Sequence, residues 1–318
     1  MTSRNDIFYI ISDLCVKVNI SILIFESEYG IIELTKNHTM KRCIPLDKLK
    51  PSLTPEEERQ RNLELLANYR PLDDDFMREL FRNNLELAQF VLRIIIDKPD
   101  LKLTKEETQY DLQHLFGERS ICLDVFGVDS EGQQYDFEVQ RQDKGATPQR
   151  ARYHSSAMDV DNLKAKKQFS DLPNTYVIFI TENDFFGKGK AVYPIERMNL
   201  ATGEPFHDGE HILYINGAYE NKEDTSDLAK LIHDFRCSKA EDMLLPPLAD
   251  RTRYFKETPE GVDYMCKAME DRITDEKIMI AYNLLLLGTV SKEDIAKVTK
   301  LPIETINELE EEMKSVSA

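Results

Sequence analysis

Residues 119–142 read as two β-strands joined by a short turn, and this pattern restricts the fold more than any other stretch of the 318-residue chain. Arg119–Val128 and Gln134–Gln142 alternate apolar and polar side chains with the period of a strand. The five residues between them include Gly132, which tolerates a positive φ, and five is a common hairpin length. An antiparallel pair centred on Glu131 predicts that residues face each other when their numbers sum to 262.

The predicted register brings two carboxylates face to face. Asp124 and Glu138 are partners in it, with Cβ atoms ~5 Å apart, and alternation adds Asp136 and Gln140 to the same face. Facing carboxylates repel each other unless a cation compensates, and Mg²⁺ binds one or two carboxylates together with water and phosphate oxygens. The alternative is an amphipathic hairpin whose acidic face lies in water, which is a common arrangement. Phe126 on the acidic face favours a covered surface instead.

The other face of the predicted hairpin is mostly apolar, with Leu123 and Val125 on the first strand. Around the hairpin, the order of elements indicates an α/β or α+β sandwich. A cap, a proline and two acids begin a helix at Thr54, and Asp73 begins a second helix whose apolar residues continue to Ile94. Further helices are predicted at about 148–169 and 224–235. Strands are predicted at about 119–128, 134–142, 174–181, 191–198 and 211–216.

The C-terminal part of the chain has a mostly helical pattern. Ile273–Leu287 has an apolar face that ends at Gly288, and short helices at 291–298 and 302–313 follow in the arrangement of a helix-turn-helix. Residues 270–318 hold 6 basic and 11 acidic side chains, so their net charge is −5. Because an acidic module is poorly suited to a DNA groove, we expect these helices to serve in packing or in a homo-oligomer.

The overall charge excludes a protein that coats nucleic acid through general basicity. Lys and Arg number 41 against 58 Asp and Glu, a net charge of −17. Residues 141–167 nevertheless carry a net charge of +4 beside the predicted carboxylates. Such a basic strip is what phosphate contacts require, although ordinary surface lysines on a solvated helix are the alternative for Lys164, Lys166 and Lys167. Arg150 is the best candidate, because a guanidinium can donate two hydrogen bonds to a phosphate.

The cysteines and the apolar segments exclude two further classes of protein. The five cysteines, at positions 15, 43, 122, 237 and 266, show no C-x-x-C spacing, which argues against a disulfide framework and a zinc knuckle. The apolar stretch at 7–25 is interrupted by Asp13 and Lys17, so it falls short of the ~18 apolar residues of a spanning helix. We therefore expect a soluble, cytoplasmic protein with no membrane segment.

An Asp, a hairpin turn and then Glu-x-Gln resemble the core of PD-(D/E)xK nucleases, in which an acid on one strand meets (D/E)-x-K on the next. With Arg150-Ala151-Arg152-Tyr153-His154 on the following helix, the pattern resembles the Rpn-type recombination-promoting nuclease and transposase family. Leu72–Phe81 is similar to that family's opening T-D-x-x-F-K-x-L-F helix, with one extra residue between the aromatic positions, and Tyr176–Ile180 is similar to its next core strand. The resemblance covers roughly residues 55–300.

The resemblance implies a restriction-endonuclease-like core, a mixed sheet flanked by helices, that acts as a Mg²⁺-dependent DNA endonuclease. Mn²⁺ would serve as a substitute ion. By the same resemblance, Asp124 and Glu138 would bind the metal with the backbone carbonyl of Val139, and Asp73 would hold a metal-bound water from the first helix.

The implied substrate contacts lie at three positions. Arg150 and Tyr153 would contact the scissile phosphate, and Gln140 would stand where relatives carry Lys. A neutral Gln can orient water or donate a hydrogen bond to phosphate, but it cannot offset developing negative charge. The alternative, motivated by Gln140 and by the acidity of the chain, is a catalytically inactive nuclease-fold protein that serves in binding or interaction.

We predict three regions along the chain. Residues 1–53 are an N-terminal leader, in which Met40 precedes a basic linker and is a candidate start of the native protein. Residues 54–240 form the nuclease-like domain, and residues 241–318 form a helical C-terminal region that ends in the helix-turn-helix-like tail.

Overall fold

The computed structural model describes residues 23–27, 30–34, 40–44, 54–112, 121–141, 145–163 and 167–316. The chain divides into two compact units, residues 1–58 and 59–318. The described part of the first unit includes three antiparallel strands in the order β1-β2-β3. These strands are β1 (Leu23–Ser27), β2 (Gly30–Leu34) and β3 (Met40–Ile44).

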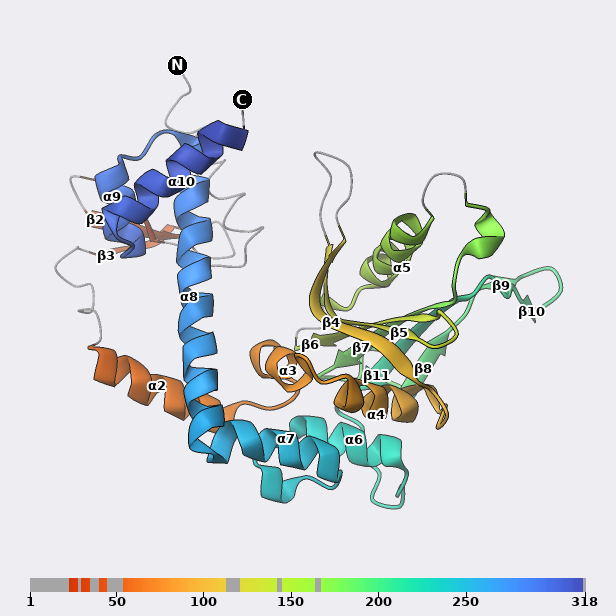
Figure 1. Cartoon of the computed structure of the whole chain (residues 1–318). Coiled ribbons are helices and arrows are strands. Elements are labelled where there is room, and N and C mark those ends of the chain that lie inside the picture. Colours follow the sequence, from red (N-terminus) through yellow and green to blue (C-terminus); the bar gives the residue numbers. More distant parts are fainter. Residues whose placement is uncertain are drawn as a thin grey trace. The chain divides into compact units, whose positions relative to one another are not determined.

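The second unit is built on a six-stranded mixed sheet with the order β4-β5-β6-β7-β11-β8 (Figure 1). β4, β5 and β6 pair antiparallel, β6, β7 and β11 pair parallel, and β8 is antiparallel to β11. The strands are β4 (Leu103–Leu112), β5 (Ile121–Asp129), β6 (Gln134–Gln140), β7 (Thr175–Thr181), β8 (Val192–Ile195) and β11 (Glu210–Asn216). A separate short pair consists of β9 (Met198–Asn199) and β10 (Glu204–Pro205). The mixed sheet confirms the predicted fold class.

The predicted register of the β5–β6 hairpin is confirmed. Val125 pairs with Phe137 and Phe126 with Asp136, and each pair of numbers sums to 262. Gly132 in the turn has a φ of 82°, the left-handed conformation for which its lack of a side chain suits it.

The side-chain alternation of β5 is broken at one place. Leu123, which alternation assigned to the same face as Val125, packs instead with Phe126 beneath α5 (Pro148–Asn162). Gln109 of β4 lies between the Thr108–Val125 and Tyr110–Leu123 pairs and has a φ of 56°, so the neighbouring strand is distorted at this point. The irregularity lies beside a residue of the predicted site.

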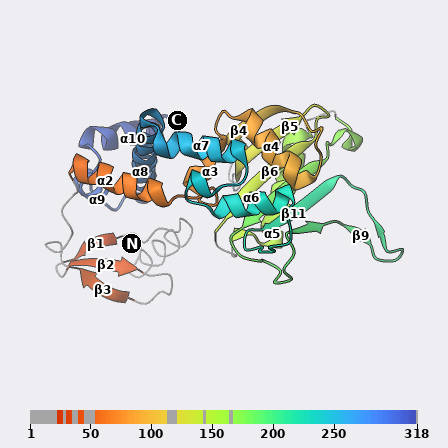
Figure 2. The ribbon, with the colours of Figure 1, turned by 90° about the horizontal axis from the view of Figure 1, so that it is seen from below.

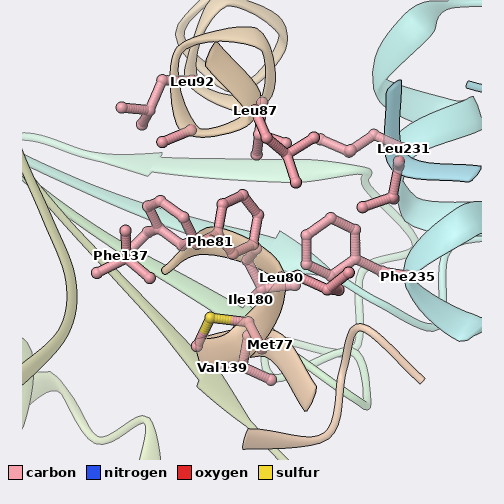
Figure 3. Packing of buried hydrophobic residues seen from close by; sticks show 14 of the residues in the cluster. Met77, Leu80, Phe81, Leu87, Leu92, Phe137, Val139, Ile180, Leu231 and Phe235 are labelled. Atoms are coloured by element: carbon pink, nitrogen blue, oxygen red, sulfur yellow. The ribbon is translucent and has the colours of Figure 1, made fainter. Parts of the chain in front are cut away.

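Helices cover both faces of the sheet (Figures 1 and 2). α5 packs on one face, while the larger hydrophobic core lies between the other face and the helices α3 (Asp74–Phe81), α4 (Leu85–Ile96), α6 (Asp227–Arg236) and α7 (Pro246–Glu257). Figure 3 shows Phe81 of α3 and Phe235 of α6 in this core, together with Phe137 of β6. The Phe81 and Phe137 rings meet edge to face, with centroids 4.9 Å apart.

The single helix predicted from Asp73 onward, with apolar residues as far as Ile94, is two helices, α3 and α4. Asn83 adopts a φ of 52°, and the side chain of Asn84 accepts a hydrogen bond from the amide of Leu87 at 3.2 Å, which caps α4. Asn is favoured at both kinds of position, so these two residues end one helix and begin the next.

Two further elements differ from the prediction. α5 ends at Asn162 rather than near Phe169, where a 3₁₀ turn (Phe169–Asp171) follows, and the Asn162 side chain donates to the carbonyl of Met158. β4 was not predicted at all. It is an edge strand that carries Lys105, Glu106 and Glu107, and charges of this kind protect a sheet edge but mask the period-two pattern.

The remaining helices confirm the predicted caps. α2 (Pro55–Asn68) begins with a reciprocal cap, because the amide of Thr54 donates to Glu57 and the amide of Glu57 donates to Thr54. α8 (Pro259–Leu287) ends at Gly288, whose φ is 63°. α9 (Lys292–Thr299) and α10 (Ile303–Val316) pack on its last turns through a small apolar cluster. Within the described residues, none of the helices has both the length and the apolar composition needed to cross a membrane.

Candidate active site

The two predicted metal ligands adjoin each other across the β5–β6 hairpin. The backbone amide of Asp124 donates a hydrogen bond to Oε1 of Glu138 at 3.0 Å. Asp124 is only 6% exposed, and Glu138 is fully buried. The carboxylate of Glu138 therefore accepts a hydrogen bond from the amide of the residue that the predicted register places opposite it, just beyond the last observed pair, Val125–Phe137.

A third carboxylate lies two residues earlier on the same face of β6. Asp136 is fully buried, and its Oδ2 lies 2.9 Å from Nδ1 of His154 on α5. The same nitrogen lies 3.8 Å from Oε1 of Glu138. The second oxygen of Asp136, Oδ1, is buried and has no hydrogen-bond partner among the described residues. An acceptor left in this state costs free energy unless it binds a proton or a cation.

α5 carries the basic side chains of the site. Its first turn is fixed by the hydroxyl of Thr147, which accepts from the amide of Arg150, and by Pro148 at the first helical position. Arg150 and His154 are four residues apart, so they share one helix face above β6. Nη2 of Arg150 pairs with Oε2 of Glu138 at 2.6 Å, and its Nε donates to Nε2 of His154 at 3.2 Å.

Gln140 occupies the position at which the resemblance places a Lys in relatives, and the same guanidinium holds it. Nη1 of Arg150 donates to Oε1 of Gln140 and to the carbonyl of Gly145, both at 3.4 Å. A Cβ atom on Gly145 would lie 1.8 Å from Oε1 of Gln140, so only a glycine permits this position of the amide. The site therefore constrains Gln140 from two sides.

α3 brings a further arginine and a further acid to the site. Nη2 of Arg78 pairs with Oδ1 of Asp124 at 3.1 Å. Burial raises the pKa of Asp74, and the negative charge of Asp124 raises it further, so these two carboxylates interact. Neither Arg78 nor Asp74 was assigned a role from the sequence.

Asp73, the neighbour of Asp74, lies in a different group of charges. Its carboxylate pairs with Arg70 at 3.2 Å and with Arg141 at 3.1 Å, and both arginines also contact Glu182. The role predicted for Asp73, to hold a metal-bound water, stays a prediction, and the described contacts give its carboxylate two arginine partners.

The remaining predicted substrate contacts are only partly described. Tyr153 on α5 is 42% exposed. Of the basic strip, Arg152 and Lys167 are exposed, whereas Lys144, Lys164 and Lys166 lie outside the described residues. The structure thus places Arg150 closest to the carboxylates and leaves the strip as a prediction.

The carboxylates of the site repel one another in a medium of low dielectric. Burial raises the pKa of Asp136 well above its ordinary value, and the charge of Asp124 raises it further. Burial and the charges of Asp136 and Asp124 likewise raise the pKa of Glu138, against opposing effects of His154 and Arg150. The positive charge of Arg150 therefore compensates only part of the negative charge of the carboxylates. A further cation would stabilise the ionised forms.

The donor atoms of this cluster suit a hard divalent cation. Asp136 and Glu138 supply carboxylate oxygens, which Mg²⁺ and Mn²⁺ prefer, and Oδ1 of Asp136 is a buried oxygen that no described residue uses. Two groups among the described residues have His, Cys or carboxylate donors close enough to share an ion. One of them is Asp136, Glu138 and His154, so it includes the predicted ligand Glu138 but not Asp124.

The second group, His233, Asp234 and Cys237, is explained by packing. The carboxylate of Asp234 accepts hydrogen bonds from the amides of Leu244 and Leu245 at 2.8 and 2.7 Å. Burial raises the pKa of the Cys237 thiol to about 11, so the thiolate that a metal requires is disfavoured. We assign this group to the connection between α6 and α7.

A cavity of about 720 Å³ adjoins the site on the α3 side. Arg78 lines it, together with Tyr69 and Tyr264, and Arg78 also pairs with Asp124. The lining includes as many acidic as basic side chains, five of each, so its charge alone does not favour a polyanion. The arginine that pairs with Asp124 therefore lines this cavity, whereas Asp124, Asp136 and Glu138 are not among its lining residues.

The mixed sheet, the carboxylate hairpin and the helices on both faces define a restriction-endonuclease-like α/β fold. Residues 82–236 match the family model of the PD-(D/E)XK nuclease family transposase. The match includes both strands of the hairpin and α5, whereas α3 with Asp74 and Arg78 precedes it. No curated protein and no solved structure matches the chain.

Two residues of the site carried a usable signal that the sequence analysis did not turn into a role. Asp136 was placed on the acidic face by alternation, and its distance of two from Glu138 already predicted a shared environment. His154 is four residues from Arg150, the spacing of neighbours on a helix. The contact of His154 with Asp136 depends on the packing of α5 on β6, which neither spacing contains.

Proposed function

We propose that this chain is a divalent-metal-dependent DNA endonuclease of the transposase-like, recombination-promoting PD-(D/E)XK class, with Mg²⁺ as the ion and Mn²⁺ as a substitute. The observation that carries the proposal is the buried hydrogen bond from the backbone amide of Asp124 to the carboxylate of Glu138, beside the buried carboxylate of Asp136, in a segment that matches the nuclease family model. Three carboxylates with two arginine partners leave an excess of negative charge, which a divalent cation would compensate.

Each side chain has a role that its contacts support. Asp124 and Glu138, with the carbonyl of Val139, would hold the ion, which when bound lowers the pKa of water and offsets charge on a phosphodiester. Arg150 would bind and orient the scissile phosphate with Tyr153, because its guanidinium is held at the mouth of the carboxylate cluster. Gln140 would orient the attacking water or the phosphate through its amide.

Cleavage of a supercoiled plasmid tests the proposal. Wild type, Asp124→Asn and Glu138→Gln would be incubated with Mg²⁺ and with EDTA, and nicked and linear products measured over time. Glu131→Gln, a change of the same kind at an exposed position in the turn of the same hairpin, is the matched control. We expect Mg²⁺-dependent cleavage by wild type and by the control, and none by the two site variants. Equal cleavage by all four proteins would refute the assignment.

A second candidate is an inactive nuclease-fold protein that binds DNA or a partner. Two observations favour it: Gln140 replaces a cationic Lys, and Asp124 and Glu138 each already pair with an arginine. Titration calorimetry with Mg²⁺ in parallel with the plasmid assay separates the two candidates. Ion binding without cleavage in wild type, together with cleavage gained in Gln140→Lys, would favour the inactive protein.

The C-terminal helices are proposed to mediate self-association. Met279, Tyr282 and Leu286 of α8 are 57, 42 and 61% exposed, and their spacing of three and four places them on one helix face. Sedimentation velocity of wild type and of a Met279→Glu, Leu286→Glu variant tests this role. A monomer in both cases would contradict it.

A further inference from the structure

We propose that Asp136 and His154 together position Arg150, through a histidine whose single proton lies on Nδ1. This proposal rests on the proposed function, because it concerns the arginine assigned to the scissile phosphate. It adds two positioning residues to the site, His154 in contact with the guanidinium and Asp136 behind it.

The tautomer follows from which groups can donate. A guanidinium only donates hydrogen bonds, so the 3.2 Å contact between Nε of Arg150 and Nε2 of His154 requires Nε2 to be the acceptor. An imidazole whose Nε2 accepts carries its proton on Nδ1. That nitrogen lies 2.9 Å from Oδ2 of Asp136, so it donates to the carboxylate. His154 is therefore neutral, with both ring nitrogens occupied.

Packing holds the imidazole ring in this orientation. His154 is 3% exposed and Asp136 is fully buried, and the His154 ring lies against Phe179 of β7 with centroids 6.0 Å apart. A rigid ring fixes Nε of Arg150, while Nη1 and Nη2 remain directed at Gln140 and Glu138. The Arg150 side chain is 38% exposed, so the guanidinium is held from within and still has a solvent-facing surface.

The same contacts argue against His154 as a metal ligand, although its donor atoms lie close to those of Asp136 and Glu138. A coordinating nitrogen must be free of its proton. Nδ1, the nitrogen near both carboxylates, carries the proton, and Nε2 receives the hydrogen bond of Arg150. Metal binding by His154 would have to break one of these two hydrogen bonds.

An arginine side chain has many rotamers, so contacts that hold Arg150 in one of them affect how it binds a phosphate. A guanidinium that is already oriented loses less entropy when it binds a phosphate, and a displacement of about 1 Å at a reacting group costs up to ~10²-fold in rate. We therefore expect the loss of His154 to lower the rate of cleavage through Arg150 rather than through the fold.

A double-mutant cycle on the full chain tests this route. His154→Asn keeps a donor near the Nδ1 position but removes the acceptor for Arg150, whereas His154→Gln places an amide oxygen near the Nε2 position. We expect His154→Asn to lower kcat/KM for a DNA oligonucleotide about tenfold, His154→Gln to retain most activity, and His154→Asn to have no further effect in an Arg150→Lys background. An equal loss in both backgrounds would overturn the proposal, as would a loss of one bound Mn²⁺ per chain in His154→Asn.

A spectroscopic measurement on the unaltered protein keeps the proposal testable even if a substitution prevents folding. In ¹⁵N-histidine-labelled wild type, with its six histidines, we expect a neutral ring with the proton on Nδ1 for His154. A proton on Nε2 would overturn the positioning role whatever the activity. Wild type that shows the expected tautomer but cleaves no DNA would instead refute the proposed function and support only the anchoring of Arg150.

Discussion

Two fully buried aspartates in this protein, Asp234 at the end of α6 and Asp136 on β6, differ in how their carboxylates are satisfied. Both oxygens of Asp234 accept hydrogen bonds from backbone amides, those of Leu244 and Leu245, so the carboxylate holds the start of α7. Asp136 has one oxygen on His154 and one without a partner among the described residues, and it faces two other acids. A buried carboxylate whose oxygens both accept hydrogen bonds from the backbone stabilises the fold. A buried carboxylate that lies among other negative charges is a candidate for function.

The largest effect on stability is expected at Asp234, and it tests the difference between the two aspartates. Asp234→Asn leaves one of the two backbone amides without an acceptor, and we expect a loss of about 3 kcal/mol in the free energy of unfolding. Urea denaturation measures the change. Asp227→Asn, an exposed position on the same helix, is the matched control with an expected change below ~0.5 kcal/mol. Plasmid cleavage by folded Asp234→Asn should equal that of wild type, and its loss would assign Asp234 to the site.

A divalent ion bound near Asp136 should change the free energy of unfolding by an amount comparable to that expected for Asp234→Asn. Mg²⁺ at roughly 100 times its Kd is expected to raise the free energy of unfolding of wild type by about 2.7 kcal/mol, because it binds the folded state alone. Glu138→Gln should show no such increase, while Asp234→Asn should show all of it. Thermal denaturation with and without EDTA measures both, and stabilisation of Glu138→Gln equal to that of wild type would place the ion elsewhere.

A smaller effect is expected where a glycine makes room for Gln140. Gly145→Ala would place a Cβ atom 1.8 Å from Oε1 of Gln140, and the flexible amide can move away at little cost to the fold. We expect kcat to fall about tenfold, equivalent to ~1.4 kcal/mol, with a change in unfolding free energy below ~1 kcal/mol. Gln140→Ala provides the control background, in which Gly145→Ala should change kcat less than twofold. An unchanged kcat in the native background would mean that Gln140 does not act from this position.

The smallest effect concerns a half-buried acid outside the site. Burial raises the pKa of Glu106 from 4.5 to about 7. Because the folded state binds the extra proton, stability falls as the pH rises from about 4.5 to about 7, and the full penalty applies above that range. After discounting for solvent screening, we expect Glu106→Gln to be more stable than wild type by about 1 kcal/mol at pH 8 and equal to it at pH 4. Glu107→Gln, at the exposed neighbour, should show no such dependence in urea titrations.

The sequence contained enough to predict the hairpin and its two acids. The turn at Gly132 and the period-two pattern fixed the register, and the register brought Asp124 to Glu138. These are local signals, and the strand pairing they predict requires no other part of the chain. The break between α3 and α4 also had a local signal, the two asparagines Asn83 and Asn84, but the helical spacing of the apolar residues around them predicted one continuous helix.

What could not be predicted depends on helix phase and on tertiary packing. Asp73, Asp74 and Asp75 are consecutive, and a shift of one residue turns a helical side chain by about 100°. Only the packing of α3 decides that Asp74 interacts with Asp124 while Asp73 pairs with Arg70. In the same way, the neutral state of His154 depends on contacts from β6 and α5 that meet only in the folded chain.

The ion pairs of the two predicted metal ligands have a consequence for mutagenesis. Asp124 is bound to Arg78 of α3 and Glu138 to Arg150 of α5, so each carboxylate ties a different helix to the hairpin. Alanine at either position would leave a partly buried guanidinium without its carboxylate partner, and the resulting loss of stability would obscure any effect on catalysis. Asn and Gln keep the shape and a hydrogen-bond acceptor, so the amide substitutions are the ones that separate loss of charge from loss of structure.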